Sequence, residues 1–169
     1  MSNLTSTAWP INEGHAKRLY SLTKLEGKDI ILYWHVTGPE PGAGWDNLTS
    51  MFNFEAENTI TALGWINPDE SYHERIFVIS KQGQLWMYQL DSDNKPDYNS
   101  FGPVGSLLTA LTSPLHLTAV QLSYPSSSPC YTVYCHDHYD AKKPFDNHVY
   151  EMTFYEGSWR PWTKALPQT

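Results

Sequence analysis

Short hydrophobic runs alternate with polar segments rich in glycine and proline along the whole chain, and no stretch keeps the period of an amphipathic helix. Residues 76–79 and 85–88 are apolar or aromatic throughout. Runs of this length suit strands that are buried on both faces, and they are too short to span a membrane as helices. The pattern therefore predicts an all-β protein of short strands joined by turns.

The order of these runs repeats three times. Each repeat opens on a Thr-Ala pair, beginning at Thr7, Thr61 and Thr118, so the openers are 54 and 57 residues apart. Strand-like runs follow each opener, at 18–21 and 30–34, 75–78 and 84–88, and 132–135 and 149–154. Each repeat closes on a glycine beside an aromatic residue. Four short strands in a unit of this size are typical of a β-propeller blade. The sequence predicts one domain, 1–169, with blades at about 1–54, 55–114 and 115–169.

Three blades do not close a ring, because propellers usually contain four to eight. An open arc would leave apolar faces uncovered on its first and last blades, which favours association. Two arcs related by a two-fold axis would give six blades and no open end. We therefore expect half of a six-bladed β-propeller, completed by homodimerisation. The alternative is a fragment of a longer protein.

The charge and the N-terminal sequence bear on the partners and the location of the protein. The formal net charge is -7, and the 11 Lys and Arg residues form no cluster, so nucleic acid and anionic membranes are poor partners. The first residues lack the basic start and apolar core of a signal peptide, which predicts a cytoplasmic protein, or a secreted one if a leader has been removed. Cys130 and Cys135 are five apart on one predicted strand, so they should point to opposite faces and stay free thiols.

Three stretches, 117–122, 132–137 and 149–159, resemble the repeats of the fungal fucose-specific lectins, which are six-bladed propellers. The resemblance covers most of the chain. It implies a sugar site in each blade, made by an Arg of the second strand, a Glu of the third and an aromatic residue near the fourth. The charged pair would bond sugar hydroxyls, and the aromatic ring would cover the apolar side of the sugar.

No blade keeps both charged members of that triad. In blades one and two the arginine is present and another residue takes the glutamate position, giving Arg18 with Leu32 and Arg75 with Trp86. Blade three has Glu151, but Thr132 replaces the arginine. The broken triads predict no measurable fucose binding. The two arginines could instead pair with carboxylates such as Glu13 and Glu74.

Aromatic residues stand where the charged contacts are lost, which suggests an apolar ligand. The ligand-binding candidates are Trp34, Trp86, Tyr88, Glu151 and Trp159. The scaffold also resembles the fungal hetero-Diels–Alderases. That resemblance implies a cofactor-free pericyclase of secondary metabolism, which joins an apolar alkene to a quinone-methide-like diene.

A cycloaddition needs little more than two reactants held in one orientation. Residues that could polarise a carbonyl as charge shifts are Arg18, Arg75, Tyr134 and His136. The histidines at 136, 138 and 148 fall in a segment that looks like a loop, so we expect no metal, and no motif calls for a cofactor. The alternative function is a fucose-type lectin that binds glycans. A structural or partner-binding propeller is the third.

Overall fold

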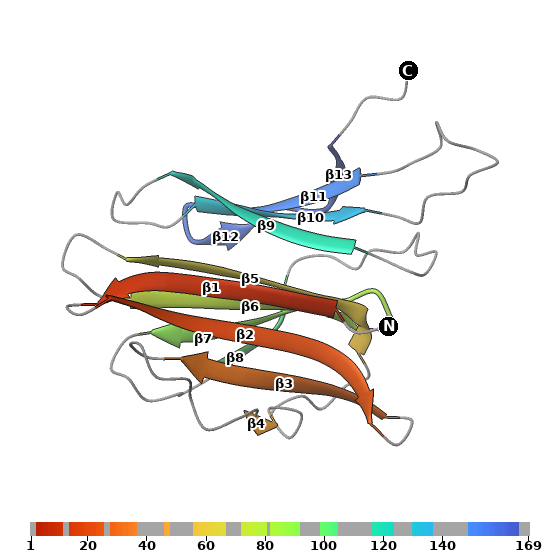
Figure 1. The fold of residues 1–169 in the computed structure, drawn as a ribbon. Coiled ribbons are helices and arrows are strands. Elements are labelled where there is room, and N and C mark those ends of the chain that lie inside the picture. Colours follow the sequence, from red (N-terminus) through yellow and green to blue (C-terminus); the bar gives the residue numbers. More distant parts are fainter. Residues whose placement is uncertain are drawn as a thin grey trace.

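The computed structural model describes residues 3–11, 14–25, 28–36, 46–47, 56–66, 72–80, 82–91, 99–104, 116–123, 130–136 and 149–165. Within these ranges every regular element is a β-strand, so the all-β prediction is confirmed (Figure 1). The strands form three antiparallel sheets, and in each sheet the first four strands pair in the order in which they follow one another in the chain.

Sheet one contains β1 (Asn3–Ile11), β2 (Gly14–Leu25), β3 (Lys28–Val36) and β4 (Asp46–Asn47). Sheet two contains β5 (Ala56–Ile66), β6 (Tyr72–Ser80), β7 (Leu85–Asp91) and β8 (Asn99–Val104). Sheet three contains β9 (His116–Ser123), β10 (Cys130–His136), β11 (Val149–Tyr155) and β12 (Ser158–Trp159), and β13 (Thr163–Lys164) also pairs with β11.

The first strands of the three sheets pack side by side, β1 on β5 and β5 on β9. A threonine hydroxyl joins the two strands in both contacts. The Ala62 amide donates to Thr5 Oγ1 at 3.2 Å, and the Leu117 amide donates to Thr59 Oγ1 at 2.9 Å. Successive sheets therefore meet through the same kind of contact, and sheet two lies between sheets one and three (Figure 1).

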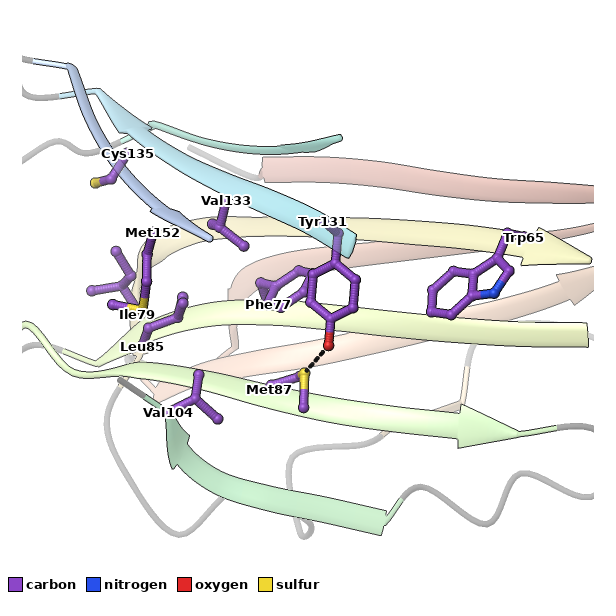
Figure 2. Close-up of a cluster of buried hydrophobic side chains, with 10 residues drawn as sticks. All are labelled: Trp65, Phe77, Ile79, Leu85, Met87, Val104, Tyr131, Val133, Cys135 and Met152. Carbon is purple, nitrogen blue, oxygen red and sulfur yellow. Dashed lines mark hydrogen bonds between the residues drawn. The ribbon is translucent and has the colours of Figure 1, made fainter. Parts of the chain in front are cut away.

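A hydrophobic cluster lies between sheets two and three, and we call it the intersheet core (Figure 2). Its members are Trp65, Phe77, Ile79, Leu85, Met87, Val104, Tyr131, Val133, Cys135 and Met152. Tyr131 is central, because its ring stacks on Phe154 at 5.0 Å and its hydroxyl donates to Met87 Sδ at 3.4 Å. Burying a large apolar side chain is worth about 1.5–3 kcal/mol, so this contact holds the two sheets together.

The opposite face of β6 turns toward sheet one, because side chains alternate along a strand. Glu74, Ile76 and Val78 lie on it, all essentially without solvent contact. Gly64 allows the close approach of the two sheets. A Cβ at this position would lie 2.9 Å from the Tyr72 hydroxyl and 3.2 Å from Thr7 Cβ.

Candidate functional site

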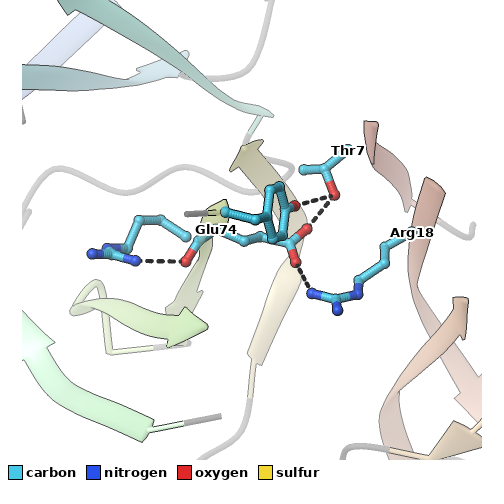
Figure 3. Close-up of polar contacts among 5 residues, drawn as sticks. Thr7, Arg18 and Glu74 are labelled. Carbon is cyan, nitrogen blue, oxygen red and sulfur yellow. Dashed lines mark hydrogen bonds and ion pairs between the residues drawn. The ribbon is translucent and has the colours of Figure 1, made fainter. Parts of the chain in front are cut away.

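A buried ion pair joins sheets one and two (Figure 3). Glu74 is fully buried on β6, and its Oε2 accepts a hydrogen bond from Arg18 Nη1 of β2 at 2.7 Å. The other carboxylate oxygen accepts from the Thr7 hydroxyl. Tyr72 donates to the same Thr7 oxygen at 3.3 Å, and the Arg18 guanidinium lies over the Tyr72 ring, 5.5 Å from its centroid. The charge on Arg18 is thus neutralised inside the protein.

The buried ion pair also affects the pKa of Tyr72. Its burial, and next the negative charge of Glu74, raise the pKa of the phenol well above its usual value of 10.0. The phenol stays protonated and keeps its hydrogen bond to Thr7 at every ordinary pH.

Arg75 is the second arginine that the sequence singles out, and it points the other way from Glu74. It is buried, with its guanidinium 5.0 Å from the ring centroid of Trp65 and its Nη1 donating to the Glu74 carbonyl oxygen at 2.8 Å. Trp65 also stacks on His73, with ring centroids 5.5 Å apart. Arg75 therefore belongs to the interface between sheets two and three, whereas Arg18 belongs to the interface between sheets one and two.

Equivalent positions in the three sheets can be assigned from strand register. Arg18, Arg75 and Thr132 are separated by 57 residues each time, and each lies on the second strand of its sheet. The residue two places further on pairs with the third strand, which gives the pairs Tyr20 with Tyr33, Phe77 with Met87, and Tyr134 with Glu151. The counterparts of Glu151 are therefore Tyr33 and Met87.

This register corrects the sequence analysis, which placed Leu32 and Trp86 at the glutamate position. Trp86 pairs with Val78, not with Phe77, and so lies on the opposite face of β7 from Met87. A shift of one residue along a strand turns every side chain to the other face, which is why the assignment failed. The triad remains broken, because neither Tyr33 nor Met87 carries a charge.

Three of the predicted site residues lie together on the outer face of sheet three, the face directed away from the intersheet core. Tyr134 and Glu151 are cross-strand partners, and His136 follows two places along β10. By the alternation of the strands, this outer face comprises His116, Thr118, Val120, Leu122, Thr132, Tyr134, His136, Val149, Glu151, Thr153 and Tyr155. The structure thus joins Tyr134, His136 and Glu151, and separates them from Arg18 and Arg75.

Polar contacts order the centre of the outer face. The hydroxyls of Thr132 and Thr153 lie 2.8 Å apart, and Thr163 donates to Glu151 Oε1 at 3.4 Å. The rings of His116 and His136 stack, with centroids 6.4 Å apart. Around them, apolar side chains are exposed: Val120 by 38%, Leu122 by 54% and Tyr155 by 45%. The surface combines a carboxylate, hydroxyls, imidazoles and apolar patches.

The chemistry of the outer face differs from that of its counterpart on sheet two, which sheet three covers. Three core positions of sheet two, Phe77, Ile79 and Met87, are at most 5% exposed. Their counterparts in sheet three are the polar set Tyr134, His136 and Glu151. Polar groups are costly to bury without partners, so this face suits a partner or ligand that supplies hydrogen bonds.

The remaining candidates lie elsewhere. Trp159 is half-buried against the intersheet core, with its ring 5.6 Å from that of Tyr131 and 5.5 Å from that of Phe154. Trp86 and Tyr88 share the face of β7 opposite to Met87, and Tyr88 is buried. Trp34 lies on β3 opposite Leu19, and its side chain is outside the described set.

The sequence analysis also considered a histidine cluster, two cysteines and membrane-spanning helices. The histidines at 138 and 148 are outside the described residues, and among those described no group of His, Cys, Asp and Glu could hold a metal ion. Cys135 is buried and Cys130 half-buried, and neither of the two forms a disulfide. A search for helices long and apolar enough to cross a membrane finds none in the described ranges.

Sequence reasoning named Glu74 as one carboxylate that could pair with an arginine, but it missed that Glu74 is buried and joins sheets one and two. The available signal was the adjacent pair Glu74-Arg75 at the start of a strand that is otherwise apolar. Two consecutive charges on a strand buried on both faces must each find a partner on a different neighbouring layer.

Comparison with known proteins identifies the architecture. No protein-family model matches the chain, and no curated protein matches it. Solved structures do. A variant of the lectin from Aleuria aurantia, in complex with alpha-methyl-L-fucoside, matches with a TM-score of 0.61 and 20% identity, over 99% of this chain and 50% of that one. The chain has a lectin-like β-propeller fold.

Two further structures agree. A fucose-specific lectin from Aleuria aurantia, in a mercury-derivative form, gives a TM-score of 0.61 at 18% identity, over 98% of this chain and 48% of that one. A fucose lectin from Kordia zhangzhouensis, in complex with methyl-fucoside, gives 0.53 at 18% identity, over 98% of this chain and 99% of that one. The chain therefore spans about half the length of the Aleuria lectins and nearly all of the Kordia lectin.

Proposed function

We propose that this protein binds carbohydrate through the outer face of sheet three, with Glu151 as the central contact. The observation that carries the proposal is the exchange of Phe77 and Met87 for Tyr134 and Glu151 at matched positions of a face that no described strand covers. This exchange turns a protein-packing surface into one that can bond hydroxyl groups. The lectin-like fold supports the same conclusion.

Each group on this face has a role in such a site. The Glu151 carboxylate accepts hydrogen bonds from two neighbouring sugar hydroxyls, and such charge-assisted bonds are about twice as strong as neutral ones. The Tyr134 ring covers the apolar side of the sugar. Thr153 adds a hydroxyl, which lies 2.8 Å from the hydroxyl of the buried Thr132. Recognition by arginine is not part of the proposal, because Arg18 is paired with Glu74 and Arg75 lies over Trp65.

We also propose that the three sheets are three blades of a half propeller, with the boundaries 1–54, 55–114 and 115–169. A second copy would complete the ring. The match to about half of each Aleuria chain supports this reading.

The test is a glycan array that carries fucosylated and non-fucosylated sugars, followed by calorimetric titration of each sugar that binds. Glu151→Gln should weaken binding at least tenfold, because it removes the charge and keeps the shape. The matched control is Glu156→Gln, an exposed residue of the β11–β12 turn, which should leave binding unchanged.

Two results would overturn the proposal. One is the absence of any sugar that binds. The other is binding that survives Glu151→Gln and is instead lost in Arg75→Ala, since that pattern would locate the site between sheets two and three. Because the described strands place no arginine on the outer face, we expect fucose itself to give no measurable signal.

A further inference from the structure

We infer that a second copy of this chain covers the outer face of sheet three and that the partner's Lys17 pairs there with Glu151. This inference rests on the proposed function and names the residue that the partner adds to the glycan site. It follows from three residues that occupy the same position in their sheets, directly before the arginine position of the second strand. These are Lys17, Glu74 and Tyr131, which are separated by 57 residues each time.

The two sheet interfaces inside the chain show what this position does. Glu74 of sheet two reaches sheet one and contacts Arg18. Its counterpart in sheet three, Tyr131, reaches sheet two and donates its hydroxyl to Met87 Sδ at 3.4 Å. In both cases the residue before the arginine position extends from its own sheet onto the face of the preceding sheet.

The third interface would repeat the contact between Tyr131 and Met87 with the next member of each series. The contact between Glu74 and Arg18 would instead bring Lys17 to Thr132, which carries no charge. Met87 corresponds to Glu151, and Tyr131 corresponds to Lys17. The contact between the Tyr131 hydroxyl and the Met87 sulfur thus becomes a contact between an ammonium and a carboxylate. A lysine side chain has about the reach of a tyrosine, so the distance suits the exchange.

Burial and charge agree with this pairing. Lys17 is exposed on sheet one, and it lies on the face opposite to Arg18 because neighbouring side chains on a strand alternate. Leu4, which is 62% exposed, lies on the same uncovered face of sheet one. It would meet the exposed Val120 and Leu122 of sheet three, so apolar and charged groups match across the interface.

The partner's Lys17 also restores a charge that the chain itself has lost. The arginine position of sheet three is Thr132, so among the described residues neither cross-strand partner of Glu151, Tyr134 or Thr163, is a lysine or an arginine. In the dimer, the ammonium donates and the carboxylate accepts, which gives a sugar both kinds of charged contact. The glycan site is incomplete without the second copy, and the two-fold axis makes two such sites.

The test is a charge exchange measured by sedimentation equilibrium at low ionic strength. The wild-type protein should sediment as a dimer, twice the chain mass of 19.3 kDa. Lys17→Glu and Glu151→Lys each place like charges at both interfaces, and each should raise the dimer dissociation constant at least tenfold. The double variant, which restores opposite charges, should return it to within about threefold of wild type. Circular dichroism checks that every variant is folded.

The matched control is Lys164→Glu, the same charge reversal on β13. Lys164 pairs with Tyr150 and so lies on the opposite side from Glu151. It should not change the dissociation constant. A monomeric wild type, single variants that dimerise normally, or a double variant no better than the single ones would each overturn the inference.

Glycan binding separates this inference from the proposed function. If the charge exchange behaves as expected and no sugar binds, the proposed function fails and the dimer interface stands. If monomeric Lys17→Glu binds sugar with wild-type affinity, the glycan site stands and the inference fails.

Discussion

Removing the charge of Glu74 should destabilise the protein more than any other isosteric change of a carboxylate in the described residues. The side chains of Glu74 and Arg18 are 0% and 4% exposed, and their ion pair measures 2.7 Å. Breaking a buried pair by removing one partner typically costs about 3–5 kcal/mol, because the other charge is left uncompensated. Gln keeps the volume and one acceptor, so we expect the lower end, about 3 kcal/mol, for Glu74→Gln.

Urea unfolding at a fixed protomer concentration measures this loss. With a slope of roughly 1–3 kcal/mol per molar urea, a loss of about 3 kcal/mol lowers the midpoint by about 1–3 M at unchanged slope. Concentration must be fixed because association adds to the apparent stability. Glu156→Gln, at an exposed turn, is the control and should stay within about 0.5 kcal/mol of wild type.

A double-mutant cycle isolates the pair itself. Arg18→Met alone should also destabilise strongly, since it leaves Glu74 buried without its cation. The variant that combines Arg18→Met with Glu74→Gln contains neither charge and should recover at least half of the summed loss. Our reasoning is refuted if Glu74→Gln costs less than about 1 kcal/mol, or if the two single losses simply add.

Three further predictions concern the same interface and the alternative function. Because the pKa of Tyr72 is raised in the folded protein, its contribution to stability is complete below pH 10.0 and falls as the pH rises above that value. Between pH 10 and 11, the free energy of unfolding of the wild type should fall by roughly 1 kcal/mol more than that of Tyr72→Phe. The control is Tyr155→Phe, at an exposed tyrosine. Gly64→Ala should destabilise by about 1–3 kcal/mol in thermal unfolding, because its Cβ would lie 2.9 Å from the Tyr72 hydroxyl. The pericyclase hypothesis predicts that the protein changes the product ratio of a quinone methide precursor and a humulene-type alkene, and a ratio equal to the protein-free control contradicts it.

The fold was largely predictable because its signals are local. Strand-length apolar runs and turn residues recur with each repeat, and short-range patterns of this kind report secondary structure directly. The strands of the runs 76–79 and 85–88 are both present, in β6 and β7.

The site was less predictable because it depends on register and on which faces are covered. Trp86 and Met87 are neighbours in the sequence, yet they point to different sheets, and only the pairing of β6 with β7 decides between them. Trp159 is of a residue type that can stack on a sugar, but it packs against Phe77 and Tyr131. The partner of Arg18 lies 56 residues away, a separation at which no spacing rule applies.

That separation has a consequence for synthesis. The strands of sheet one are complete once residue 47 has been made, but Arg18 cannot form its ion pair with Glu74 until that residue emerges. At a translation rate of roughly 5–20 residues per second, the 56 residues between them take about 3–11 s. During that interval the nascent chain carries the Arg18 guanidinium without Glu74, beside Tyr20 and Leu22, two side chains that are destined for burial. Slow codons between the two positions would lengthen the exposure, and a chaperone that holds extended apolar segments would find its substrate there.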